Sequence, residues 1–176
     1  MFEGFQYISE HGILRRHDYR DYHKSKGSCD LGPEGTGRRA AIRDIGYVEH
    51  DGRVNDELKE LLNRQPISIG MRTTGMLQMY SGGIMTESFL HCSSTNNEVN
   101  HGVLLIGYGT SDPHDKDTRG CRDYWIIRNS WGGNWGEHGM FKLCADGLGS
   151  QETPMGTCLV NKYSVWPTMD KSDIEE

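Results

Sequence analysis

The segment Gly102–Gly109, GVLLIGYG, is a continuous apolar run that decides the fold of this 176-residue chain. Such a run predicts a strand that is buried on both faces. Two shorter apolar segments, Tyr124–Arg128 (YWIIR) and Gly139–Leu143 (GMFKL), flank a connection rich in glycine and tryptophan. We interpret both as strands of one antiparallel hairpin, and Leu159–Trp166 as the last apolar segment of the fold. The second half is therefore predicted to be mostly β.

Helices are predicted in the first half. One is expected to start at Met1 and to stop at His11-Gly12. Another is expected to begin at Asn55, as its N-cap, and to run through Leu62. Between them, the polar and glycine-rich stretch His17–Gly37 is interpreted as a long loop. The strand candidates of this half are Ile42–Val48 and Pro66–Met71. Because helices come first and strands later, the predicted fold class is α+β.

The composition argues against two classes of partner. The chain has 19 basic and 25 acidic residues, a net charge of -6, and no basic stripe. We therefore expect neither a nucleic acid nor an anionic membrane as a partner. No apolar run approaches the ~18 residues of a membrane span. The N-terminus has neither the basic nor the apolar region of a signal peptide, so none is expected at Met1.

One histidine and one asparagine stand where strands are predicted to begin and end. His101 comes directly before the buried strand, and Asn129 follows another strand 28 residues later. An asparagine side chain can hold the tautomer and ring angle of an imidazole, so that its other nitrogen faces a nucleophile. Trp131 and Trp135 would keep water off that hydrogen bond. The alternative is a glycine-rich turn with aromatic packing beside an ordinary histidine.

The cysteine pattern indicates disulfides rather than zinc. There are five cysteines and no CxxC pair, which argues against a zinc ribbon. If the hairpin pairs as expected, its extended ladder brings Cys121 close to Cys144, and a disulfide there is sterically reasonable. The odd count leaves at least one thiol unpaired or paired outside the chain. Such pairing needs an oxidising compartment.

The polar insertion Ser111–Arg122 contains four residues of metal-ligand type, Asp112, His114, Asp115 and Asp117. We interpret it as a solvated acidic loop rather than a metal site. Neither a metal nor a cofactor is predicted.

Several segments together strongly resemble the papain-like cysteine peptidases, the cathepsin L type in particular. The most specific are Val99–Gly109 (VNHGVLLIGYG), Tyr124–Gly132 (YWIIRNSWG) and Trp135–Gly139 (WGEHG). Four others match the family in the same order: Phe5–Ile8, Gly12-Ile13, Gln65–Ile69 and Tyr80–Ile84. The resemblance extends from Phe5 to about Pro167.

The resemblance implies a papain-like α+β fold, mostly the antiparallel β-barrel lobe plus a remnant of the helical lobe. It assigns residues 1–50 to that remnant and a connecting loop. Residues 51–167 form the β-barrel lobe that carries the histidine and asparagine, and residues 168–176 are an acidic tail.

The resemblance also implies roles for single residues. His101 is the general base and thiolate partner, Asn129 orients it, and Trp131 shields their hydrogen bond. Cys92 and Cys158 correspond to the disulfide of the barrel lobe, and Cys29 to half of another whose partner lies upstream of Met1. Gly70, Val99, Gly102 and Tyr163 correspond to the main hydrophobic subsite. Tyr163 would shorten that pocket, which favours small aliphatic side chains of a substrate.

The nucleophile of the family is missing from the 176 residues. Its signature, C-G-[SA]-C-[WY], stands some 130–150 residues before the histidine and asparagine of the family. His101 has only 100 residues before it, so the expected place falls before Met1. We therefore interpret the chain as the C-terminal part of a papain-like cysteine peptidase, inactive as an isolated chain.

Two alternatives remain at this point. The chain is a non-catalytic papain-like protein that serves as a structural or binding subunit of a larger assembly, or it is a fragment that inhibits or binds the full enzyme. As a peptidase it would act on peptides or proteins once an N-terminal chain completed it. Otherwise a protein partner would cover the missing lobe. Resemblance suggests a lysosomal, vacuolar or secreted location, in spite of the missing signal peptide.

Overall fold

A computed structural model describes residues 1–19, 23–27, 39–48, 54–92, 98–112, 114–145 and 155–168. The chain divides into two compact units: one is Met1–Gly46 with Pro167–Glu176, and the other is Tyr47–Trp166. The predicted lobe boundaries, after residues 50 and 167, stay predictions. Cys29, most of the predicted loop His17–Gly37 and the tail from residue 169 lie outside the described residues.

The first unit contains the predicted N-terminal helix. Helix α1 spans Phe2–His11 and ends at Gly12, whose φ of 69° favours glycine. A Cβ atom at Gly12 would lie 3.0 Å from the Cβ of Arg39, so the turn also needs a small residue. This unit also contains the antiparallel strands β1 (Ile13–Leu14) and β2 (Arg39–Ala40), and the 3-10 turn η1 (Arg16–Asp18).

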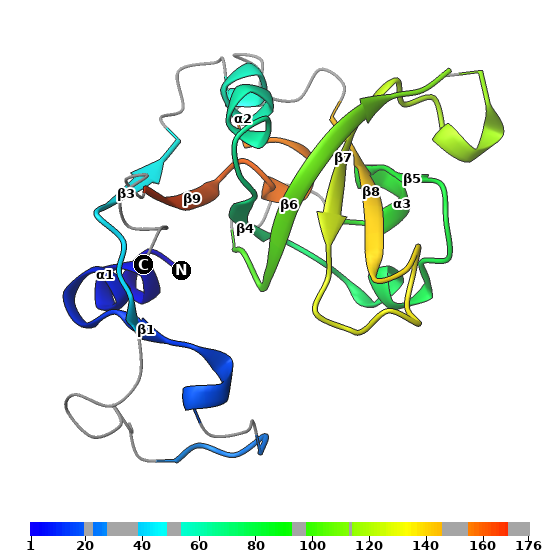
Figure 1. The fold of residues 1–176 in the computed structure, drawn as a ribbon. Coiled ribbons are helices and arrows are strands. Elements are labelled where there is room, and N and C mark those ends of the chain that lie inside the picture. The colour runs from blue at the N-terminus through cyan, green and yellow to red at the C-terminus, as the bar shows by residue number, and fades with distance from the viewer. Residues whose placement is uncertain are drawn as a thin grey trace. The chain divides into compact units, whose positions relative to one another are not determined.

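A seven-stranded sheet has the order β3-β9-β4-β6-β7-β8-β5 (Figure 1). Its strands are β3 (Asp44–Tyr47), β4 (Ile67–Met71), β5 (Ile84–Met85), β6 (His101–Thr110), β7 (Asp123–Arg128), β8 (Met140–Cys144) and β9 (Tyr163–Thr168). The pairs β4–β6, β4–β9, β6–β7 and β7–β8 are antiparallel, whereas β5 runs parallel to β8. The predicted hairpin of β7 and β8 is confirmed.

The prediction that β6 is buried on both faces is wrong. Val103 and Leu105 are buried, but the alternate residues Leu104 and Ile106 are only half-buried. A bulge between Leu105 and Gly107 shifts the register with β7. The sequence predicts two buried faces because both faces of the run carry apolar side chains, and the sequence alone does not show what packs onto each face. The strand is ten residues long and extends beyond the core.

The core of the second unit is formed by one face of the sheet together with a helix. Helix α2 spans Val54–Leu62 and buries Val54 and Leu58 completely. The largest side chains that are almost fully buried come from the sheet and from its connections; they include Trp125, Phe141, Ile67, Ile69, Met71, Leu77, Met85, Leu105, Ile127 and Leu143. Among the described residues, no helix is both long enough and apolar enough to cross a membrane.

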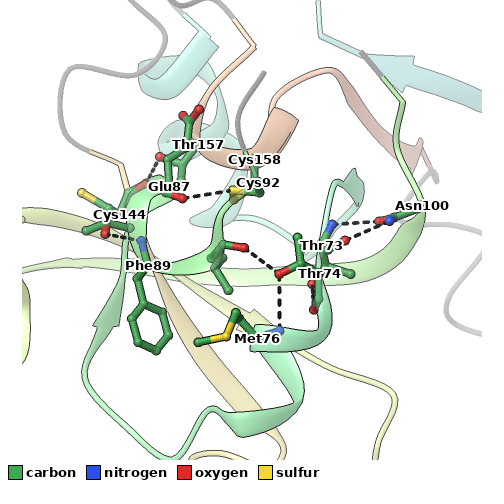
Figure 2. The surroundings of a disulfide bond; sticks show 12 residues. Thr73, Thr74, Met76, Glu87, Phe89, Cys92, Asn100, Cys144, Thr157 and Cys158 are labelled. Carbon is green, nitrogen blue, oxygen red and sulfur yellow. Dashed lines mark hydrogen bonds between the residues drawn. A yellow bond between two sulfur atoms is a disulfide. The ribbon is translucent and has the colours of Figure 1, made fainter. Parts of the chain in front are cut away.

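The described residues form two disulfides, one between two connections and one between a connection and β8, and both pairings agree with prediction. Cys92 and Cys158 have Cα atoms 5.3 Å apart, and Cys121 and Cys144 have Cα atoms 5.8 Å apart. Thr157 links the two regions, because its hydroxyl donates to the carbonyl oxygen of Cys144 at 2.7 Å (Figure 2). The short helices of this region are η2 (Gly75–Met79), α3 (Glu87–Leu90), η3 (Lys116–Thr118) and η4 (Thr157–Leu159).

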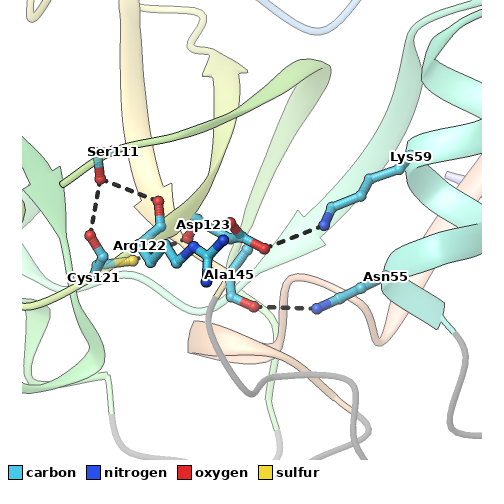
Figure 3. Close-up of polar contacts among 7 residues, drawn as sticks. All are labelled: Asn55, Lys59, Ser111, Cys121, Arg122, Asp123 and Ala145. Carbon is cyan, nitrogen blue, oxygen red and sulfur yellow. Dashed lines mark hydrogen bonds and ion pairs between the residues drawn. The ribbon is translucent and has the colours of Figure 1, made fainter. Parts of the chain in front are cut away.

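The prediction that Asn55 caps α2 is wrong, because Val54 before it is already helical. Its side chain is used in a tertiary contact instead. Asn55 Nδ2 donates to the carbonyl oxygen of Ala145 at 3.2 Å, directly after β8 (Figure 3). One turn further along the helix, Lys59 Nζ lies 3.4 Å from Asp123 Oδ2 at the start of β7. The polar face of α2 is thus attached to the strands of the hairpin.

Candidate active site

His101 is held by the end of a β-ladder. It is the first residue of β6 and lies opposite Met71, the last residue of β4. Asn100 extends this ladder beyond the strands, because its side chain accepts from the Thr73 N–H at 2.8 Å and donates to the Thr73 carbonyl at 2.9 Å (Figure 2). The amide of Asn100 therefore acts as an additional rung beside His101.

Asn129 comes from the neighbouring strand. It follows Arg128, the last residue of β7, and its backbone N–H donates to the carbonyl oxygen of Gly139 at 2.9 Å. Its side chain is buried, with 7% of the residue exposed. Oδ1 of Asn129 lies 3.0 Å from Nε2 of His101 and also accepts the backbone N–H of Ser130 at 2.8 Å.

These two hydrogen bonds determine the tautomer of the imidazole. The N–H of Ser130 can only donate, so the Asn129 atom that faces it must be the carbonyl oxygen rather than the amide nitrogen. The same oxygen faces His101 Nε2, which must therefore carry a hydrogen. In the neutral ring the lone pair is then on Nδ1. Nδ1 is the atom of this pair that can accept a proton from another group.

Trp131 packs against the imidazole. The ring centroids of His101 and Trp131 are 5.3 Å apart with the planes tilted by 41°. Trp135 lies one ring further away and meets Trp131 edge-on, at 4.9 Å between centroids. Trp131 itself is 39% exposed, and its role as a shield of the hydrogen bond stays a prediction. The structure thus brings His101, Asn129 and Trp131 together, as the sequence predicts.

Three residues near this group were not singled out from the sequence. The hydroxyl of Tyr80 donates to Oε2 of Glu137 at 2.8 Å, and Oε1 of Glu137 lies 3.1 Å from Nζ of Lys142. Burial raises the pKa of Tyr80, and the hydrogen bond with Glu137 raises it further. Because 57 residues separate Tyr80 from Glu137, no local pattern could reveal the pair.

The predicted subsite residues lie on adjacent strands. Gly70 of β4 is opposite Gly102 of β6 on one side and Tyr163 of β9 on the other. A Cβ atom at Gly102 would meet nothing within 4 Å, and Tyr163 is 51% exposed. Val99 is half-buried, two residues before His101. The structure therefore aligns three of the four in one row, while their role in binding stays a prediction.

The described cysteines are all in disulfides. The pairs are Cys92–Cys158 and Cys121–Cys144. A sulfur in a disulfide cannot form the thiolate that a cysteine peptidase needs. Of the five cysteines in the sequence only Cys29 is left, and it lies outside the described residues.

Comparison with known proteins agrees with this geometry. Residues 1–168 match the family described as "Papain family cysteine protease". The chain is 32% identical to Pro-cathepsin H of Medicago truncatula over 157 residues, which are 89% of this chain and 40% of that protein. It is 36% identical to Procathepsin L of Mus musculus over 143 residues, which are 81% of this chain and 39% of that protein.

A solved structure shows the same fold. The cysteine protease CMS1MS2 of Carica candamarcensis, determined in complex with E-64, superposes with a TM-score of 0.70 at 27% identity. The match covers 95% of this chain and 67% of that protease. The chain spans about 40% of the length of the curated relatives named above. The family matches residues 1–168, and the fold agrees with that of a solved cysteine protease. The chain therefore belongs to the papain family of cysteine proteases.

Proposed function

We propose that this chain is the C-terminal part of a papain-like cysteine peptidase and supplies the histidine and asparagine of a Cys-His-Asn site. The observation that carries this proposal is the hydrogen bond from His101 Nε2 to Asn129 Oδ1 at 3.0 Å. It fixes the tautomer in which the lone pair of Nδ1 can accept the proton of a thiol. A fold kept only for binding would need no such arrangement.

The chemistry of the site follows from that tautomer. A cysteine thiol transfers its proton to Nδ1 of His101, and the thiolate sulfur attacks the carbonyl carbon of a peptide bond. The C–N bond then breaks, the imidazolium returns its proton to the leaving amine, and water hydrolyses the thioester. Throughout, Oδ1 of Asn129 accepts a hydrogen bond from the Nε2–H group of His101, which keeps the ring from rotating.

The nucleophile of this site comes from outside the 176 residues. The family's cysteine signature does not occur in the sequence, and the described cysteines are bonded to one another. Removing the nucleophile of a catalytic triad lowers kcat by roughly a millionfold. The chain is therefore inactive when it is isolated from a polypeptide that carries the cysteine.

The substrate is a peptide or protein with a small aliphatic side chain at the main subsite. Gly70 and Gly102 line up with Tyr163 across three strands. In a subsite formed there, the tyrosine ring would take up space that an aromatic substrate side chain would need. A library of fluorogenic peptides tests this preference. Faster cleavage of the peptides with aromatic side chains at that position would contradict it.

The experiment that tests the catalytic proposal begins with the native mass of the protein purified from its source, and with peptide mapping of everything that accompanies it. We expect a companion polypeptide with a cysteine-tryptophan motif, labelled by an epoxide-type thiol probe. His101→Ala should abolish both hydrolysis and labelling. His114→Ala is the control, because that histidine is exposed and lies in the polar insertion.

A different result would change the conclusion. If the chain is found without such a companion, bound within a larger assembly, the catalytic proposal is wrong. The alternative, a non-catalytic structural or binding subunit, would then hold. Probe labelling that survives His101→Ala would also contradict the assigned role of the imidazole.

A further inference from the structure

Tyr80 is a buried tyrosine whose hydroxyl lies among three polar groups. Oε2 of Glu137 is 2.8 Å away, the carbonyl oxygen of Gly83 is 2.9 Å away, and the backbone N–H of Lys142 donates to the phenolic oxygen at 3.3 Å. The hydroxyl has one proton, and the charged carboxylate is the stronger acceptor. The hydroxyl therefore connects Glu137 to strand β8.

Glu137 begins a tight turn that leads into β8. Its N–H donates to the carbonyl of Met140 at 2.9 Å, and the N–H of Met140 donates back at 3.1 Å. The two central residues, His138 and Gly139, have φ values of 56° and 86°, as in a type I′ turn. The carbonyl of Gly139 in turn accepts the backbone N–H of Asn129. The Glu137 turn thus supplies the carbonyl group that holds the Asn129 backbone.

The ring of Tyr80 begins a continuous series of aromatic contacts that ends at the imidazole. Its centroid is 5.7 Å from that of Trp135, which is 4.9 Å from Trp131. Trp131 is 5.3 Å from His101. Each ring is in contact with the next, so the series links the Tyr80 ring to the imidazole.

We propose that Tyr80 and Glu137 are positioning residues for the His101–Asn129 pair. Their hydrogen bond fixes the turn that holds the Asn129 backbone and the ring that supports Trp131. The consequence for catalysis rests on the proposed function, but the effect on the imidazole is independent of any activity. Burial raises the pKa of Tyr80, so its hydroxyl stays protonated and remains a donor well above neutral pH.

The central test is Tyr80→Phe in the full chain labelled with 15N at histidine and tryptophan. This change removes one hydroxyl and retains the ring. We expect the 15N shifts of His101 to move from those of the Nε2–H tautomer toward the average of the two tautomers, and the indole N–H signals of Trp131 and Trp135 to shift. Tyr108→Phe is the matched control, because its exposed hydroxyl lies 3.5 Å from Asn63 Oδ1.

Variants of Glu137 and Lys142 distinguish the effect of the Tyr80–Glu137 hydrogen bond from that of the Glu137–Lys142 ion pair. The Glu137 side chain is 34% exposed, so its variants are expected to fold even if Tyr80→Phe does not. Glu137→Gln keeps an acceptor oxygen for Tyr80 and should keep the tautomer, whereas Glu137→Ala should lose it. Lys142→Met removes the ion pair, together with the contact of the ammonium with the Tyr124 ring, but retains the Tyr80–Glu137 hydrogen bond, so it should leave the tautomer unchanged. Equal effects of Glu137→Ala and Lys142→Met would overturn the proposal.

Kinetics of the completed peptidase provide a second readout. Tyr80→Phe should lower kcat by about tenfold with little change in KM, since a displaced imidazole affects the chemical step more than binding. Unchanged 15N shifts in Tyr80→Phe would overturn the positioning role even if the peptidase is found. If the source protein contains no cysteine-bearing companion, the proposed function fails, while altered shifts still support the positioning role.

Discussion

Nε2 of His101 and Oδ1 of Asn129 lie 3.0 Å apart, although 28 residues separate the two in the chain. The sheet brings them together. Leu104 of β6 pairs with Arg128 of β7, so Asn129 stands one residue beyond that rung, on the side toward His101. The contact is thus a consequence of the antiparallel register of β6 and β7.

Replacing Asn129 by alanine should release the imidazole. The change removes the acceptor of His101 Nε2 and leaves the N–H of Ser130 without its partner. We expect both neutral tautomers in 15N spectra and a loss of about 1–2 kcal/mol in the free energy of unfolding. Asn129→Asp keeps an oxygen acceptor and should keep the single tautomer. A single Nε2–H tautomer in the alanine variant would show that the hydrogen bond does not select it.

The hairpin and its disulfide could be predicted because they depend on local patterns. Two apolar segments around a glycine-rich connection define β7 and β8, and pairing them sets Cys144 opposite Tyr124. Cys121, three residues earlier, then falls within disulfide reach. The positions of His101 and Asn129 at strand ends indicate a contact but leave an ordinary histidine as the alternative, and it is the family resemblance that favours the pair.

Tertiary contacts between distant segments could not be predicted. Asn55 has the sequence of a helix cap, but its amide bonds instead to Ala145, 90 residues away. Tyr80 and Glu137 carry no pattern that relates them, since they meet through an aromatic cluster rather than a shared strand. Apolar runs such as β6 show which residues can be buried, and only the packed structure shows which are.

The two disulfides should differ in their contribution to stability. Cys92 and Cys158 are 66 residues apart, and Cys121 and Cys144 are 23 residues apart. Loop-closure entropy then predicts about 4 kcal/mol for the first and about 3 kcal/mol for the second. Urea unfolding of the Cys→Ser pairs measures both losses. A larger loss for the Cys121–Cys144 pair would contradict an entropic origin.

Tyr80 should make the protein less stable at alkaline pH. Its pKa is raised in the folded state, first by burial and then by the bond with Glu137. An unfolded tyrosine titrates at a pKa of about 10, so above that pH the unfolded state binds fewer protons than the native state. The contribution is therefore complete below about pH 10 and is lost as pH rises, by at most about 1.4 kcal/mol per pH unit.

The variant Tyr80→Phe has no titrating group at position 80. We expect its free energy of unfolding to fall less steeply above about pH 10 than that of the parent chain. Tyr108→Phe should follow the parent, because that tyrosine is 40% exposed. Denaturant unfolding at a series of alkaline pH values measures the slopes. Three equal slopes would mean that the hydroxyl of Tyr80 is ionised as easily in the native protein as in the unfolded chain.

Gly109 should be intolerant of a methyl group only while Tyr124 is present. The two are opposite each other in β6 and β7, and a Cβ atom at Gly109 would lie 2.6 Å from the Tyr124 ring. That ring packs against the small cluster of Ile84, Cys121 and Cys144, which limits its movement. Gly109→Ala should therefore destabilise the chain by about 1–3 kcal/mol.

A double-mutant cycle isolates this clash. In a Tyr124→Ala background the alanine at 109 has room, so its effect should fall to near zero and the coupling energy should be at least about 1 kcal/mol. Gly102→Ala, on the same strand, is the control, since a Cβ atom there meets nothing within 4 Å. An equal loss of stability from Gly109→Ala in both backgrounds would mean that the glycine is needed for its backbone conformation, and not to make room for the ring of Tyr124.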